Sequence, residues 1–131
     1  MGVTYLLDTH TLIWLLGAPH RVGADVRDEL ARGENRLLVS AVSAMEVATK
    51  VRLGKLDEAK FLVSTWEQRI ADLRAEELSV SPPHALLAGS MDWDHRDPFD
   101  RMLAAQALVE NVPLVTADSV FSGLPGLRTR W

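Results

Sequence analysis

Five acidic residues stand at points where the chain is expected to change from one type of secondary structure to another. They are Asp8, Glu46, Asp97, Asp100 and Asp118. At an effective dielectric constant of about 20, two like charges roughly 4 Å apart repel each other by about 4 kcal/mol. If such residues cluster, they must share protons or bind a cation. A divalent metal ion is the simplest way to stabilise the cluster.

The type of ligand indicates which metal this would be. The sequence contains no cysteine, and carboxylate oxygens favour Mg²⁺ or Mn²⁺, whereas zinc usually takes His or Cys. Such ions can activate a water for hydrolysis and stabilise a leaving oxygen. We expect Asp8 to be the central ligand, because a buried strand would hold it rigidly. The pattern is compatible with one ion or with two.

Strands and helices are expected to alternate along the chain. The apolar runs 3–7 and 37–39 are typical of strands buried on both faces, and further strands are predicted at 77–80, 114–116 and 127–130. Helices are predicted at 12–16, 23–33, 41–53, 58–73, 82–91 and 99–111. This order predicts an α/β fold with a mostly parallel sheet of four to five strands, covered by helices on both faces.

These elements would bring four of the acids together. Asp8 and Asp118 follow predicted strands, and the carboxyl ends of parallel strands meet at one edge of a sheet. Glu46 lies on the 41–53 helix, at the rim of its expected buried face. Asp100 stands in the first turn of its helix, where the helix dipole favours a carboxylate. That position also suits a simple capping residue.

The composition narrows the class of protein. A chain of 131 residues with 47% hydrophobic content is expected to form a single domain, residues 1–131. The absence of cysteine fits a reducing compartment. No basic stretch precedes the first apolar run, and residues 12–18 are too few to span a bilayer. We therefore predict a cytoplasmic protein without a membrane partner.

The formal charge argues against a protein that coats nucleic acid. Fourteen basic and 18 acidic residues give a net charge of −4, which excludes a uniformly positive surface. If four acids bind metal, however, the remaining charges balance. Nucleic acid therefore stays open as a substrate.

The acidic motifs, taken in order, resemble a known family. Leu7-Asp8-Thr9, Met45-Glu46, Asp97-Pro98-Phe99-Asp100-Arg101 and Thr116-Ala117-Asp118 resemble the PIN-domain ribonucleases, and most of all the VapC-type toxins of bacterial toxin–antitoxin pairs. The resemblance runs from Met1 to about Phe121. It implies a PIN-like three-layer sandwich, an endoribonuclease that depends on a divalent metal, a homodimer, and inhibition by a cognate antitoxin.

The resemblance also assigns roles to single residues. Those that match the acidic quartet of the family, as catalytic and metal-binding residues, are Asp8, Glu46, Asp100 and Asp118. Asp97 belongs to a segment that is typical of one branch and is assigned a supporting role. Thr9 and Thr116 resemble the small hydroxyl residues that support the carboxylates.

Basic residues near the proposed ligands are candidates for contacts with RNA phosphates. They are Lys50, Arg52, Arg96 and Arg101.

Histidines and tryptophans receive structural interpretations. His95 is expected to be a surface imidazole in a polar loop. Trp14 and Trp66 are expected to pack in a core or an interface, although single-stranded RNA is often bound by aromatic stacking.

Three other functions fit the sequence less well. A phosphotransfer protein with an aspartate after its first strand would need a second Asp at position 10, which is His, or a late Lys, and no Lys follows Lys60. A catalytically idle binding module would not need the complete acidic set. A PIN nuclease of RNA maturation is closer, and the gene immediately upstream would distinguish it from a toxin.

Overall fold

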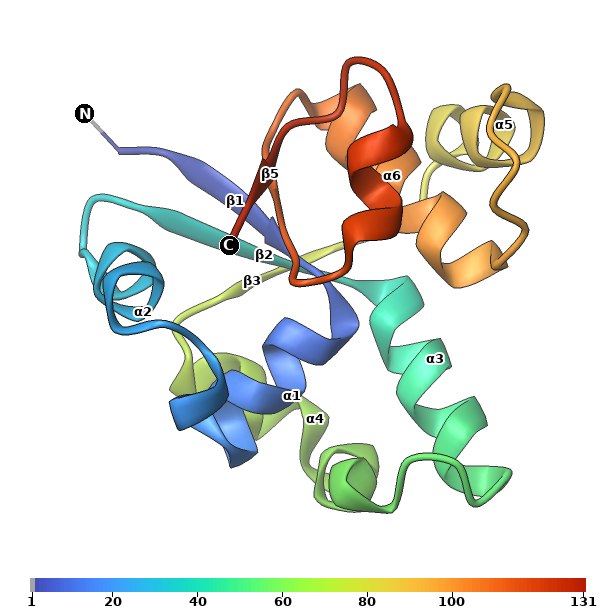
Figure 1. Ribbon diagram of the computed structural model, residues 1–131. Coiled ribbons are helices and arrows are strands. Elements are labelled where there is room, and N and C mark those ends of the chain that lie inside the picture. The colour runs from blue at the N-terminus through green and yellow to red at the C-terminus, as the bar shows by residue number, and fades with distance from the viewer. Residues whose placement is uncertain (1) are drawn as a thin grey trace.

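The computed structural model describes residues 2–131, in which five strands form one parallel sheet in the order β3-β2-β1-β4-β5 (Figure 1). The strands are β1 (Thr4–Leu7), β2 (Arg36–Ser40), β3 (Glu76–Leu78), β4 (Leu114–Val115) and β5 (Thr129–Arg130). The central strand β1 pairs with β2 and β4, so that Leu6 lies between Leu38 and Leu114. The predicted parallel sheet is confirmed, and all its strand pairs are parallel.

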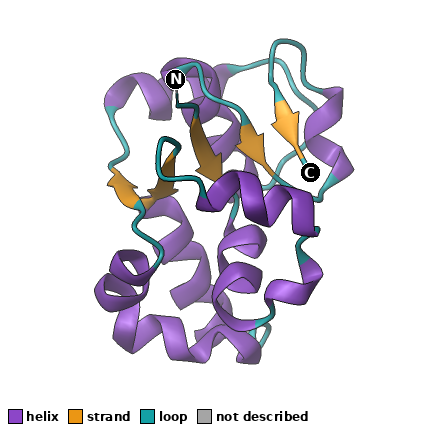
Figure 2. Ribbon diagram, turned by 90° about the vertical axis from the view of Figure 1, so that its left-hand side faces the viewer, coloured by secondary structure: helices purple, strands orange, loops and turns teal. Residues whose placement is uncertain are grey.

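Helices cover both faces of the sheet, as Figure 2 shows in purple and orange. They are α1 (Thr9–Gly17), α2 (Ala24–Ala31), α3 (Ala41–Arg52), α4 (Lys60–Asp72), α5 (Pro82–Ser90) and α6 (Pro98–Glu110). Short 3₁₀ turns lie at Pro19–Arg21, Asp57–Ala59 and Ser119–Gly123. Each predicted helix is present, with ends that differ by a few residues. Over residues 2–131, no helix combines the length and the apolar character that crossing a membrane requires.

Alternate residues of β1 point to opposite faces of the sheet and enter different cores. Tyr5 and Leu7 pack with residues of α1, α2 and α4, whereas Leu6 packs with α6 and the 3₁₀ turn at 119–123. A third cluster, around Val47 and Leu62, joins α3 and α4 to α1. Burial of β1 on both faces explains its unbroken apolar sequence. It also holds the end of the strand, where the site begins, in a fixed position.

Candidate active site

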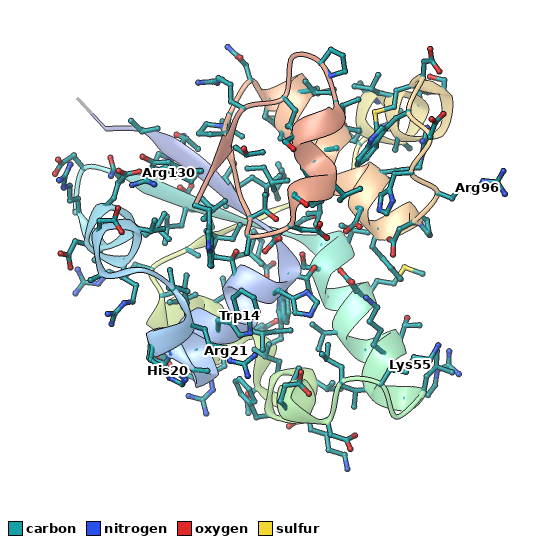
Figure 3. The ribbon with its side chains drawn as sticks, in the orientation of Figure 1. Trp14, His20, Arg21, Lys55, Arg96 and Arg130 are labelled. Atoms are coloured by element: carbon teal, nitrogen blue, oxygen red, sulfur yellow. The ribbon has the colours of Figure 1, made fainter. Side chains whose placement is uncertain are left out.

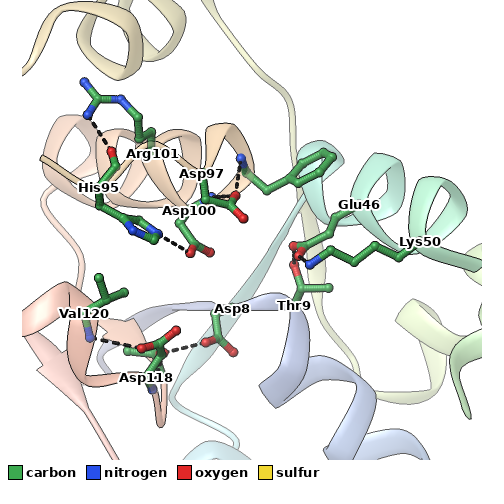
Figure 4. Close-up of polar contacts among 12 residues, drawn as sticks. Asp8, Thr9, Glu46, Lys50, His95, Asp97, Asp100, Arg101, Asp118 and Val120 are labelled. Atoms are coloured by element: carbon green, nitrogen blue, oxygen red, sulfur yellow. Dashed lines mark hydrogen bonds and ion pairs between the residues drawn. The ribbon is translucent and has the colours of Figure 1, made fainter. Parts of the chain in front are cut away.

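One cavity of about 310 Å³ lies at the carboxyl edge of the sheet and is lined by four carboxylates. Asp8 follows β1, Asp118 follows β4, Glu46 comes from α3 and Asp100 from α6. Figure 4 shows these side chains around a common space. Residues separated by more than 100 positions in the sequence are thus brought together at the place that the sequence analysis predicts.

Asp8 is the most constrained of the four acids. Its side chain is 7% exposed, and its Oδ1 accepts a hydrogen bond of 2.8 Å from the Thr11 amide, which makes it the N-cap of α1. Its Oδ2 accepts a hydrogen bond from the Thr116 hydroxyl. Burial raises the pKa of Asp8, and the hydrogen bonds from Thr116 and Thr11 oppose this rise. Both carboxylate oxygens of Asp8 are therefore held in place, although burial still disfavours the ionised form.

Thr116 also links Asp8 to Asp118. The Thr116 hydroxyl oxygen accepts a hydrogen bond of 3.0 Å from the Asp118 amide. The exposed Asp118 side chain accepts one of 3.0 Å from the amide of Val120, and so caps the 3₁₀ turn that follows. Asp118 thus lies at the open side of the cavity.

Glu46 is buried, at 4% exposure, rather than at the rim of the buried face of its helix as predicted. The Thr9 hydroxyl donates a hydrogen bond to Glu46 Oε1 and lies 3.0 Å from the Ser43 hydroxyl, while the Lys50 ammonium donates to Oε2. Met45, the apolar residue that precedes Glu46, is 62% exposed. The inner face of α3 is therefore set partly by polar contacts with α1, which apolar periodicity does not report.

Lys50 is a resident cation beside the acidic cavity. Burial lowers the pKa of Lys50, but its hydrogen bond to Glu46 and the negative charges of Glu46, Asp97 and Asp100 raise it by more. The ammonium also lies 5.9 Å from the centre of the Phe99 ring. Lys50 therefore stays protonated and neutralises part of the carboxylate charge.

Asp100 is paired with a histidine. His95 Nε2 lies 2.7 Å from Asp100 Oδ2, and the imidazole is partly buried, 5.0 Å from the Trp93 ring. Burial raises the pKa of Asp100, the hydrogen bond from His95 lowers it, and the charges of Asp97 and Glu46 raise it further. His95 lies in a loop as expected, but its imidazole is partly buried against Asp100 and is not a surface group. In the sequence, the only indication of a contact with Asp100 was the position of His95 in the loop that leads into the helix of Asp100.

Asp97 is the N-cap of α6. Its Oδ1 accepts hydrogen bonds of 2.9 Å from the Phe99 amide and 3.0 Å from the Asp100 amide. It does not line the cavity. By fixing the first helical turn, Asp97 orients Asp100, which agrees with a supporting role.

The basic residues differ in how they are engaged. Arg101 donates hydrogen bonds of 2.7 to 2.9 Å to the backbone carbonyls of Ala88, Met91, Trp93 and His95. Four of its five N–H groups are thus used to hold the loop before α6, which corrects its interpretation as a phosphate contact. Arg52 and Arg96 are exposed, and Figure 3 shows Arg96 extending away from the molecule.

The donor set fits a hard divalent cation. The cavity offers carboxylate oxygens, and burial raises the pKa values of Asp8 and Asp100, so a cation would stabilise their ionised forms. In the described conformation, however, no three acidic or histidine side chains of residues 2–131 are close enough to hold an ion. Glu46 and Asp100 are bonded to Lys50 and His95 instead. A bound cation would compete with these two partners.

The sequence and the fold both have counterparts among known proteins. The sequence model of a family described as "PIN domain" matches residues 5–127. The structure resembles VapBC2 from Rickettsia felis, bound to a DNA fragment from its promoter, with a TM-score of 0.68, 18% identity and coverage of 98% of both chains. DNA-bound VapBC from Salmonella typhimurium gives a TM-score of 0.67 at 19% identity, covering 98% of this chain and 97% of that chain.

A third structure leads to the same conclusion about the fold. VapBC-1 from nontypeable Haemophilus influenzae gives a TM-score of 0.64 at 19% identity, with coverage of 98% of this chain and 97% of that chain. A comparison with curated protein sequences gives no match. At these identities the structural likeness shows that the PIN-like fold predicted from the sequence is correct, and nothing beyond the fold.

Asp8→Asn is expected to stabilise the metal-free protein, and the gain should grow with pH. Because the folded-state pKa of Asp8 is raised, stability falls as pH rises from the unfolded pKa through the folded one. Asn removes the charge and is as good an N-cap as Asp. Urea unfolding in EDTA at about pH 4 and about pH 7 measures this difference. Free energies of unfolding with the same pH dependence in both proteins would contradict the prediction.

Proposed function

The chain belongs to the PIN domain family, and on this premise we propose that it is a metal-dependent endoribonuclease and the toxin of a toxin–antitoxin pair. Members of this family are generally nucleases. The observation that carries the proposal is the convergence of Asp8, Glu46, Asp100 and Asp118 from four separate elements into one cavity. Such an arrangement of charge serves the binding of cations better than it serves stability.

Each acid has its own part in the proposed site. Asp8 is the central ligand, since Thr11 and Thr116 fix both its oxygens. Glu46 and Asp100 would help to hold one Mg²⁺ or Mn²⁺, and Asp118 would hold a second ion or act through a water. A divalent ion, when bound, lowers the pKa of water and stabilises the leaving 3′ oxygen. The products would carry a 5′ phosphate and a 3′ hydroxyl.

The neighbouring side chains position these ligands and the substrate. Thr9 orients Glu46, and His95 orients Asp100, through the hydrogen bonds described above. If Glu46 held a cation, the Lys50 ammonium that now pairs with it would be free to contact a phosphate of the RNA. Lys50 and Arg96 therefore remain the proposed RNA contacts, and Arg101 acts only through the loop that it holds.

Asp8→Asn and Asp100→Asn are each expected to lower RNA cleavage by about 100-fold or more, because each removes a charged ligand. Asp94→Asn is the matched control, since Asp94 is exposed in the neighbouring loop and does not line the cavity. Cleavage of a labelled RNA measures the rates, and circular dichroism verifies folding. Undiminished cleavage by Asp8→Asn would end this assignment.

EDTA is expected to abolish cleavage, and excess Mg²⁺ or Mn²⁺ to restore it, because the donors are hard oxygens. The assay uses the wild-type protein in metal-free buffer, with the same RNA throughout. RNase A serves as a control for substrate quality, because its activity does not need a metal. Cleavage that survives EDTA in such buffer would rule out metal catalysis.

The role as a toxin is supported by the fold, which covers nearly the whole length of chains from VapBC complexes. We expect the chain, when its expression is induced in the bacterial cytoplasm, to arrest growth. Co-expression of a short upstream reading frame that encodes a DNA-binding N-terminus should relieve the arrest. Growth curves with and without that frame measure both effects. An Asp8→Asn chain that is equally toxic, or a chain with no effect on growth, would contradict the role. Light scattering would test the proposed homodimer.

A further inference from the structure

Trp14 lies between the carboxylate cavity and a second cavity. The indole lines both, and the second cavity, of about 440 Å³, is also lined by His20, Arg21 and Glu58. Figure 3 shows Trp14 close to His20 and Arg21, at the end of α1 and in the 3₁₀ turn that follows. Both cavities have the size of small-molecule sites. One aromatic ring therefore connects the acidic cavity to a neighbouring space.

The indole is held in place without being covered by a parallel ring. His10 and Trp131 lie 5.7 and 5.8 Å from it, centre to centre, at interplanar angles of 52° and 55°. The Arg21 guanidinium carbon lies 5.8 Å from the centre of the ring. Part of the ring packs against the cores of α1 and α4, as the sequence analysis expected. Tilted neighbours fix its orientation, and the side chain borders the open space of both cavities.

We propose that Trp14 is a stacking platform for the RNA base next to the phosphate held in the carboxylate cavity, with Arg21 beside it. This inference rests on the proposed function and names how its substrate is bound. Bases that are unstacked from a helix bind to aromatic side chains in this way, and every base has a π-face. The substrate class is therefore single-stranded RNA or an unpaired loop.

The charges of the second cavity favour stacking over phosphate attraction as the main contribution. Arg21 is positive, but the Glu58 carboxylate lines the same cavity, so that the surface is not uniformly basic. The chain as a whole carries −4. Stacking of the indole on the uncharged face of a base does not require a positive surface, so these charges do not weaken it.

Helix α1 also sets a fixed distance between the platform and the central acid. Asp8 caps the helix, and Trp14 follows six residues later on the same helix. At a rise of about 1.5 Å per residue, the two positions are about 9 Å apart along the axis. That separation suits a phosphate near Asp8 and the base of an adjacent nucleotide on Trp14.

The test compares substitutions that separate stacking from packing. Trp14→Leu keeps an apolar side chain but loses the π-face, whereas Trp14→Phe keeps the π-face. Trp66→Leu is the matched control, because Trp66 packs against the same two cores but does not line the carboxylate cavity. All three are made in the Asp8→Asn chain, so that binding is measured without cleavage, and thermal unfolding verifies that each variant is folded.

Fluorescence anisotropy measures binding of a labelled single-stranded RNA of about ten nucleotides, and of the same ribose-phosphate chain without bases. We expect Trp14→Leu to weaken RNA binding by about 5- to 100-fold and to remove the preference for RNA over the abasic chain. Trp14→Phe and Trp66→Leu should retain that preference.

Each other outcome decides the inference. It is overturned if Trp14→Leu binds RNA as tightly as its parent chain, even if that variant no longer binds a protein partner. It is overturned as well if Trp66→Leu weakens RNA binding as much as Trp14→Leu does. It is also overturned if no variant binds RNA, or if Trp14→Phe loses the preference for bases. If the Asp8-intact protein cleaves no RNA but binding still depends on the ring at position 14, the platform stands and the proposed nuclease function fails.

Discussion

The cost of burying ionised carboxylates near one another is the constraint around which this end of the molecule is built. Burial raises the pKa of Asp8 and of Asp100, and the charges of Asp97 and Glu46 raise that of Asp100 further. The protein offsets part of this cost with the Lys50 ammonium and with hydrogen-bond donors. These partners keep the acids in place, but they do not remove the cost of ionising them, so a cation has free energy to gain by entering the cavity.

Capping is the device that holds the acids at this edge. Asp8, Asp97 and Asp118 are each an N-cap, and each accepts backbone amides with Oδ1. A cap fixes the backbone and the direction of the side chain at once, because the amides stand in a rigid turn. The neighbouring strand completes the arrangement, since the Asp8 amide donates a hydrogen bond of 3.1 Å to the Val115 carbonyl. One set of residues thus begins helices and also assembles the site.

The parts of the fold that depend on local sequence were predictable. Unbroken apolar runs predicted β1 and β2. Ser40, of a residue type that favours N-caps, precedes α3 and accepts a hydrogen bond from the Val42 amide. The burial of Glu46 was not predictable, because it depends on Thr9, 37 residues earlier in the chain. The contacts of His95 and Arg101 depend on the path of the loop before α6, which no periodicity describes. Sequence reasoning therefore located the acids that line the cavity more readily than the residues that orient them.

Helix α1 couples the parts of the site to one another. Its N-cap is Asp8, its first residue Thr9 binds Glu46, and the Thr11 hydroxyl donates a hydrogen bond of 3.0 Å to the Val115 carbonyl of β4. The same helix carries Trp14 between the two cavities. A shift of α1 would therefore move a central acid, the partner of a second acid and the proposed base platform together. Substitutions along this helix should not be additive, because residues that share one rigid element and one hydrogen-bond network are coupled.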